Sequence, residues 1–197
     1  MIDFTYEIKY VKRKKICIQI VGSKVIVRCP RHCKLGNIEV LLSENKLKIK
    51  HMLSVQRKTC EFIKKIETER KIYFLGEIIT LPKGETIDSF YLIRREILIN
   101  RIKFLSTKFN LPINNLSFGK GKTAWGSCKG DNSIRLNERL VSLPEYLIDY
   151  VILHELAHTK IHNHSKNFWI LLEKMDENYK FKRQKLKEYA FILSLYK

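Results

Sequence analysis

A pentapeptide with two histidines four residues apart, His154-Glu155-Leu156-Ala157-His158, constrains the fold of this 197-residue chain more than any other segment. Residues four apart lie on one face of an α-helix, so the two imidazoles can meet at one metal ion if the segment is helical. Glu155 lies about 100° further around such a helix, where its carboxylate can reach a water held by the same metal. The spacing therefore predicts a helix with two metal ligands and a general base.

A third histidine follows six residues later. Asn163 suits a turn after the first helix, and Ser165 can cap a second helix, so the chain between them would bring His164 back toward the first two histidines. His162 competes for the same role, but His164 is favoured because its backbone is fixed at the cap of the next helix. Three protein ligands leave the fourth position of zinc open for water, which is typical of catalytic zinc. We predict one zinc ion bound by His154, His158 and His164.

The residues around the pentapeptide support a packed helix rather than a surface helix with two chance histidines. Ile148, Val151, Ile152 and Leu156 form an apolar stripe at helical spacing. Pro144 suits the first turn of this helix.

Elsewhere the sequence pattern predicts an α+β fold. Apolar residues alternate over about 4–8, 16–20 and 25–27, which predicts a meander of short strands. Helical spacing follows over about 37–50 and 51–67, then a hairpin over about 72–81, a long helix over about 88–109, and a basic helix over about 180–194. Residues 133–137 read as a strand before the metal helix, and we expect its edge to be open to an extended peptide. We predict an N-terminal β-rich region, 1–87, packed with a core of helices and a small antiparallel sheet, 88–197.

Composition narrows the class of protein. The net charge of +18 arises from 38 Lys and Arg against 20 Asp and Glu, and such an excess favours polyanionic partners such as nucleic acid. A solvated basic surface explains the charge equally well, because no nucleic-acid-binding motif accompanies it. The sequence holds no apolar run long enough for a membrane span and no signal peptide, so we expect a cytoplasmic protein without a membrane partner. An odd set of five cysteines favours reduced thiols.

Two further segments resemble binding motifs without completing them. Cys29-Pro30-Arg31-His32-Cys33 lacks the second ligand pair that a structural zinc site needs. Gly121-Lys122-Thr123 lacks the earlier glycine of a phosphate-binding loop, because position 116 is Leu. Neither segment is therefore predicted to bind a ligand.

Several stretches carry a family resemblance: Trp125-Gly126-Ser127-Cys128, Ile134-Arg135-Leu136-Asn137, the residues from Ile148 to His158, and Asn163-His164-Ser165 through Phe168-Trp169. In these stretches the chain resembles the YgjP-like zinc metallopeptidases, relatives of the SprT-like proteases. The resemblance covers most of the chain and is most specific in the C-terminal half. It implies a minigluzincin-like core in which a helix bears His154, Glu155 and His158, with His164 as the third ligand. The family usually has Arg where this chain has Ala124, so a substrate contact there is not carried over.

These observations lead to the hypothesis of a zinc-dependent peptidase that acts on a protein or peptide substrate. Arg135 and Tyr179 are candidate substrate-binding residues, and His162 joins them as a candidate donor to the oxyanion of the reaction. Two other hypotheses stay open at this point: a nucleic-acid-associated protein with a structural or inactive zinc site, and a protease recruited to DNA. The sequence sets neither an oligomeric state nor a cleavage preference.

Overall fold

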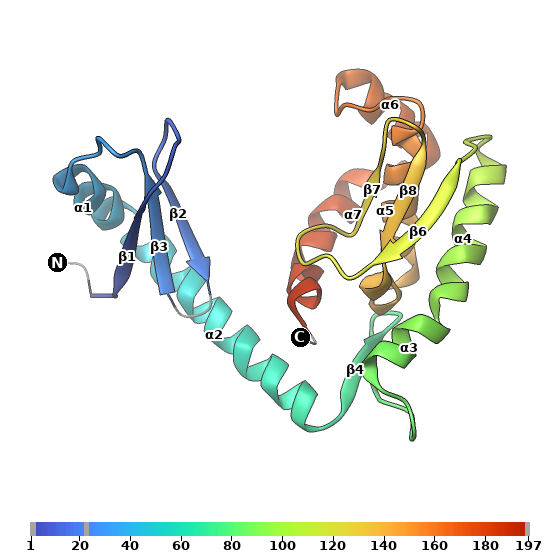
Figure 1. Cartoon of the computed structure of the whole chain (residues 1–197), viewed down its shortest axis with the longest axis horizontal. Helices are drawn as coiled ribbons and strands as arrows, with labels where there is room; N and C mark the ends of the chain where they lie inside the picture. The colour runs from blue at the N-terminus through green and yellow to red at the C-terminus, as the bar shows by residue number, and fades with distance from the viewer. Residues whose placement is uncertain (1–2, 22–23, 196–197) are drawn as a thin grey trace. The chain divides into compact units, whose positions relative to one another are not determined.

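The computed structural model describes residues 3–21 and 24–195, without the side chains at positions 55, 56, 58–60, 63, 67 and 194. The chain divides into two units, Met1–Lys65 and Ile66–Lys197. Helices and small sheets occur in both units (Figure 1), so the predicted α+β class is confirmed. None of the described helices combines the length and the apolar character needed to cross a bilayer.

A three-stranded sheet opens the first unit. Strands β1 (Tyr6–Tyr10), β2 (Cys17–Val21) and β3 (Lys24–Cys29) take the order β1-β3-β2. Strand β1 runs parallel to β3, and β2 runs antiparallel to it, so the predicted meander is wrong. The most apolar strand takes the centre, because the side chains of Val25, Val27 and Cys29 are fully buried there.

Helices α1 (Leu35–Glu44) and α2 (Lys46–Thr68) follow this sheet. Ile38 and Leu42 of α1 and Ile49 of α2 pack into the same core as the buried residues of β3. The two helices divide at Asn45, earlier than the expected division near residue 50. The Asn45 side chain explains this, because its Nδ2 donates to the carbonyl of Leu41 at 2.9 Å and caps α1.

The second unit begins with a hairpin of β4 (Lys71–Phe74) and β5 (Glu77–Thr80). The turn of this hairpin is hydrogen-bonded to residues much later in the chain. The N–H of Leu75 donates to the carbonyl of Val141 at 2.8 Å, and the N–H of Gly76 donates to the carbonyl of Ser142 at 3.0 Å. The hairpin therefore belongs with the C-terminal residues, and the two compact units divide after Lys65. The boundary at residue 87 between a β-rich region and the core stays a prediction.

Helices α3 (Ile87–Ile93) and α4 (Arg95–Lys108) occupy the region where one long helix was expected. The sheet that follows contains β6 (Asn115–Gly119), β7 (Gly126–Cys128) and β8 (Ser133–Asn137) in the order β6-β8-β7. Strand β6 is parallel to β8 and β7 is antiparallel to it, so the sheet is mixed rather than wholly antiparallel. Strand β8 lies at the centre and β6 and β7 form the two edges, so the expectation that β8 offers an edge is wrong.

The remaining elements are η1 (Glu138–Ser142), α5 (Glu145–His158), α6 (Lys166–Met175), α7 (Tyr179–Leu186) and η2 (Lys187–Ser194). Helix α5 is the central helix of this unit, and Figure 1 shows it beside the sheet and between α4 and α7. Most of its side chains are buried. The expected C-terminal helix is instead α7 followed by the 3₁₀ turns of η2.

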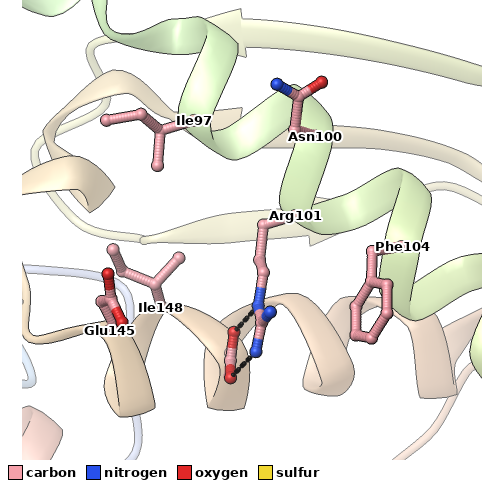
Figure 2. Close-up of a pocket in the computed structure, with 7 residues that line it drawn as sticks. Ile97, Asn100, Arg101, Phe104, Glu145 and Ile148 are labelled. Atoms are coloured by element: carbon pink, nitrogen blue, oxygen red, sulfur yellow. Dashed lines mark hydrogen bonds and ion pairs between the residues drawn. The ribbon is translucent and has the colours of Figure 1, made fainter.

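Helix α4 packs on one side of α5, where an ion pair joins the two helices and a cavity lies beside the pair (Figure 2). The Arg101 guanidinium binds the Asp149 carboxylate through two nitrogens, one of them at 2.5 Å. A cavity of about 310 Å³ beside this pair is lined by apolar residues that include Ile97, Phe104 and Ile148. None of the histidines lines this cavity, so the side of α5 that faces α4 does not carry the metal-ligand candidates.

Candidate metal centre

Three histidine side chains converge at the C-terminal end of α5. The Nε2 atom of His164 lies 3.0 Å from Nε2 of His154 and 3.2 Å from Nε2 of His158. His154 and His158 are one helical turn apart on α5, and His164 lies on the short connection before α6. Their ligand atoms all lie within 4.8 Å of one another, so a single ion can contact all three rings.

Aromatic side chains of α6 hold these rings in place. Phe168 is fully buried and stacks on His158, with centroids 4.5 Å apart and an interplanar angle of 28°. Trp169 stacks on His164 at 5.5 Å and 27°, and its Nε1 donates to the His164 carbonyl at 3.1 Å. The start of α6 thereby fixes both the backbone and the ring plane of the third histidine.

The turn between α5 and α6 has a local cause. The side-chain oxygen of Asn163 accepts a hydrogen bond from the N–H of Ser165 at 3.1 Å, which is an Asx turn. Ser165 is the residue before α6, as expected, but its side chain makes no capping hydrogen bond. Asn163 therefore sets the geometry that places His164.

The hydrogen bonds of the imidazoles suit a cation. His158 Nδ1 lies 3.0 Å from the carbonyl of Ile161, so Nδ1 carries the proton and Nε2 offers its lone pair to the cluster. The Nε2 atom of His164 lies beside the Nε2 atoms of both His154 and His158, and a single proton on it can form a hydrogen bond with only one of them. Two nitrogens that lie about 2.0–2.1 Å from one tetrahedral zinc ion are roughly 3.3 Å apart, close to the distances observed. The three residues therefore fit a zinc ion.

Burial keeps two of the histidines in the neutral form that binds metal. It lowers the pKa of His154 to about 3, and the charges of His158, His164 and Arg183 act in the same direction. Burial likewise lowers the pKa of His158, against the opposing effect of its hydrogen bond to the Ile161 carbonyl. Metal binding at these two rings therefore displaces few protons at neutral pH.

Glu155 lies between α5 and the edge strand β7. Its side chain is only 6% exposed, and burial raises the pKa of its carboxyl group to about 7. A Cβ atom added to Gly126 would lie 2.8 Å from Glu155 Cγ and 2.9 Å from Oε1, so β7 passes directly over the carboxylate. Cys128, two residues further along β7, is close enough for the Glu155 charge to raise the pKa of its thiol, after the larger effect of burial.

The other candidate residues occupy different places. Tyr179 is buried and stacks on Trp169 at 5.6 Å and 17°, which joins it to the histidine cluster through one ring. Arg135 is exposed on β8 between two buried residues, so it lies on the sheet face turned away from α5. Its guanidinium packs against the backbone of Gly119, and the side chain lines a cavity of about 190 Å³ that contains none of the three histidines. His162 is exposed and lies outside the histidine cluster of the described residues.

The cysteines add no second metal site among the described side chains. Cys17, Cys29, Cys33 and Cys128 are free thiols, and no further group of three ligand residues occurs in that part of the chain. Cys60 lies outside the described side chains.

Sequence reasoning missed Phe168, Trp169 and Gly126 as parts of this site. All three lie in stretches that carry the family resemblance, but that resemblance gave them no role. The contact between Gly126 and Glu155 could not be predicted from the sequence, because it arises only when β7 packs beside α5.

Part of the chain matches a known protein family. Residues 83–189 match the family described as YgjP-like, metallopeptidase domain. Among solved structures, the chain is similar to a metallopeptidase zymogen, abylysin of Pyrococcus abyssi, with 20% identity, a TM-score of 0.43, and coverage of 47% of this chain and 93% of that one. It is also similar to a Wss1 mutant from Saccharomyces cerevisiae, with 18% identity, a TM-score of 0.39, and coverage of 53% and 89%. No curated protein matches. Because the family match spans more than half of the chain and includes the three histidines and Glu155, the chain belongs to the YgjP-like metallopeptidase family.

Proposed function

We propose that this protein is a zinc-dependent metallopeptidase that hydrolyses peptide bonds with Glu155 as the general base. One observation carries the proposal: a buried carboxylate lies on the same helix as two of three converging histidines. A purely structural site has no use for such a carboxylate. Membership of a metallopeptidase family supports the same conclusion.

The three histidines would hold the ion and leave a position for water. When bound, zinc supplies Lewis-acid polarisation of a carbonyl and a lowered pKa of its water. His154 and His158 present their rings from a rigid helix, and Trp169 holds His164 by stacking. The ligand geometry is therefore set by packing before any ion binds.

Glu155 would move the proton of the reaction. Its carboxylate accepts a proton from the attacking water and then delivers that proton to the leaving amine. Helix α5 fixes its backbone, and Gly126 of β7 leaves the space in which the carboxylate lies. Because the Glu155 side chain is buried, its carboxylate has little room to rotate.

Strand β7 is suited to hold the substrate. It is one of the two edge strands of its sheet, and its Gly126 lies against Glu155. An extended peptide that pairs with this edge through main-chain hydrogen bonds would run close to the carboxylate. This arrangement accepts many sequences, because the backbone provides the contacts.

A conservative substitution tests the proposal. The Glu155→Gln variant should lose at least about 100-fold in the rate of peptide cleavage, because the amide cannot accept the water's proton. Its zinc content should equal that of the wild type, since the histidines are unchanged. Cleavage of a peptide library by mass spectrometry, with metal analysis of the same samples, measures both quantities.

Glu145→Gln is the matched control, because Glu145 is exposed on the same helix and lines the cavity beside α4. This variant should cleave at the wild-type rate. Wild-type cleavage rates in zinc-loaded Glu155→Gln protein would contradict the proposal.

A further inference from the structure

An open cavity of about 740 Å³ is formed by residues of α6, α7 and η2. Two aromatic side chains, Trp169 and Tyr179, line it together with three cations, Lys180, Arg183 and Lys187. The lining also includes one carboxylate, Glu188, which is paired with a lysine outside the cavity. An aromatic wall with several cations is suited to a ligand that carries a negative charge on an apolar stem.

This cavity adjoins the metal centre through Trp169. The Trp169 ring lies 6.2 Å from the His154 ring and stacks on His164, and the same side chain lines the cavity. The Arg183 guanidinium carbon lies 4.6 Å from the centroid of the same indole ring. The 6.2 Å and 4.6 Å separations together limit the distance from the guanidinium to the His154 ring to about 11 Å.

The cations of α7 differ in how they are partnered. Lys180 pairs with Glu173 at 3.2 Å, Lys182 with Asp176 at 2.8 Å, and Lys185 with Glu188 at 3.2 Å. Among the residues that the structure describes, Arg183 has no carboxylate partner. The guanidinium nearest to the metal centre on α7 is therefore available to a ligand.

The contact with the indole face holds this guanidinium without using its hydrogen bonds. A guanidinium held over an indole face keeps its N–H donors at the edge of its plane, where they match the two oxygens of a carboxylate. Tyr179 stacks on the same indole and extends the aromatic wall of the cavity. The arrangement is preorganised for a planar oxyanion.

We propose that this cavity binds a carboxylate of the substrate, so that the peptidase prefers acidic peptides. This inference rests on the proposed function and adds a substrate class to it. An extended chain advances about 3.3 Å per residue, so 11 Å corresponds to roughly three residues. The carboxylate therefore belongs to a residue within about three positions of the scissile bond, as a side chain or as the C-terminus.

Binding can be measured without hydrolysis in the zinc-loaded Glu155→Gln protein. The ligands are C-terminally amidated peptides that differ only in one Glu or Gln, placed at each position within about three residues of the cleaved bond. Calorimetry should show that the Glu peptide binds roughly tenfold more tightly than its Gln counterpart at one of these positions. If only a free C-terminus gives the tighter binding, the terminal carboxylate is the group that occupies the cavity.

Substitutions at Arg183 identify the residue responsible. Adding Arg183→Gln should abolish the preference, and Arg183→Glu should reverse it toward a Lys peptide, a gain that loss of folding cannot produce. Lys174→Gln removes one positive charge from an exposed side chain of α6 outside the cavity, so it should leave the preference unchanged. Equal affinity for charged and neutral peptides, or an equal effect of the Arg183→Gln and Lys174→Gln changes, would overturn the inference.

The wild-type protein separates this inference from the proposed function. Cleavage of the Glu and Gln peptides at equal efficiency would refute the carboxylate site and leave the peptidase intact. No cleavage of either peptide, together with binding that depends on Arg183, would refute the peptidase and retain an oxyanion site at Arg183.

Discussion

Gly126 and Glu155 form a pair in which the smaller residue determines where the larger one lies. A methyl group at Gly126 would lie within 3.0 Å of three side-chain atoms of Glu155, closer than packed atoms tolerate. Because α5 is buried on most sides, the carboxylate has to move if this space is filled. The carboxylate position thus depends on a backbone contact with β7.

Replacement of Gly126 by Ala should therefore reduce cleavage while metal binding persists. We expect a fall of about 100-fold in kcat, since an ångström-scale displacement of a catalytic group costs about that much. Gly130→Ala is the control, because a Cβ there meets nothing within 4 Å. Kinetics and zinc content of both variants provide the measurement, and a Gly126→Ala protein as active as Gly130→Ala would contradict the account.

For single residues, the sequence predicted which side chains share a face of a helix, but not on which side of a sheet a side chain lies. The separation of His154 and His158 by four residues placed them on one helical face, and the structure brings them together with His164, although their role as ligands stays a prediction. The side on which Arg135 lies could not be predicted, because it depends on which face of the sheet α5 covers. Tyr179 reaches the cluster only through Trp169, a contact set by the packing of α6 on α7.

Between elements, one buried hydroxyl pair connects α3 to η1. Tyr91 is 2% exposed, and its hydroxyl lies 3.1 Å from the Oγ of Ser142, which is fully buried. Burial raises the pKa of Tyr91 to about 12, against the opposing effect of the Ser142 hydrogen bond. The folded protein therefore favours the neutral phenol, whereas an unfolded chain ionises near pH 10.

Tyr91→Phe should lower the free energy of unfolding by about 1 kcal/mol at neutral pH, because Ser142 loses its partner. The stabilisation of the folded state that comes from the raised pKa of Tyr91 is fully present below about pH 10 and is lost as the pH rises toward about 12. The difference in stability between wild type and variant should therefore shrink above about pH 10. Urea unfolding across this pH range measures it, and a constant difference between the two proteins would show that Tyr91 titrates normally.

Elements were predicted better than their ends and their pairing. The helical period and the strand alternation of apolar residues identified most helices and strands, because both patterns follow from burial of one face of the element. The break between α3 and α4 was missed, because the apolar period continues past Arg94. The order of both three-stranded sheets was missed for a different reason: strand order depends on contacts distant in sequence, and each sheet places its most buried strand at the centre.

Across the whole molecule, positive charge is concentrated in the first unit. Residues 1–65 contain 16 Lys and Arg against 5 Asp and Glu, a net +11 of the total of +18. A polyanionic partner such as nucleic acid would therefore be expected at this unit, with affinity that falls as salt rises. Nucleic-acid binding and the cytoplasmic location both stay predictions from the sequence.

The central claim is that His154, His158 and His164 bind one zinc ion. Zinc analysis combined with X-ray absorption at the zinc edge tests it most directly, because nitrogen ligands lie at about 2.0–2.1 Å and sulfur ligands at about 2.3 Å. His164→Ala and His162→Ala are a matched pair, since both side chains are exposed on the same connection and only His164 reaches the cluster.

We predict about one zinc per chain with a nitrogen and oxygen shell that includes imidazole scattering. His164→Ala should weaken zinc binding by at least about 100-fold, whereas His162→Ala should retain wild-type affinity. A sulfur shell, or equal zinc affinity in the two variants, would contradict the assignment of this metal centre.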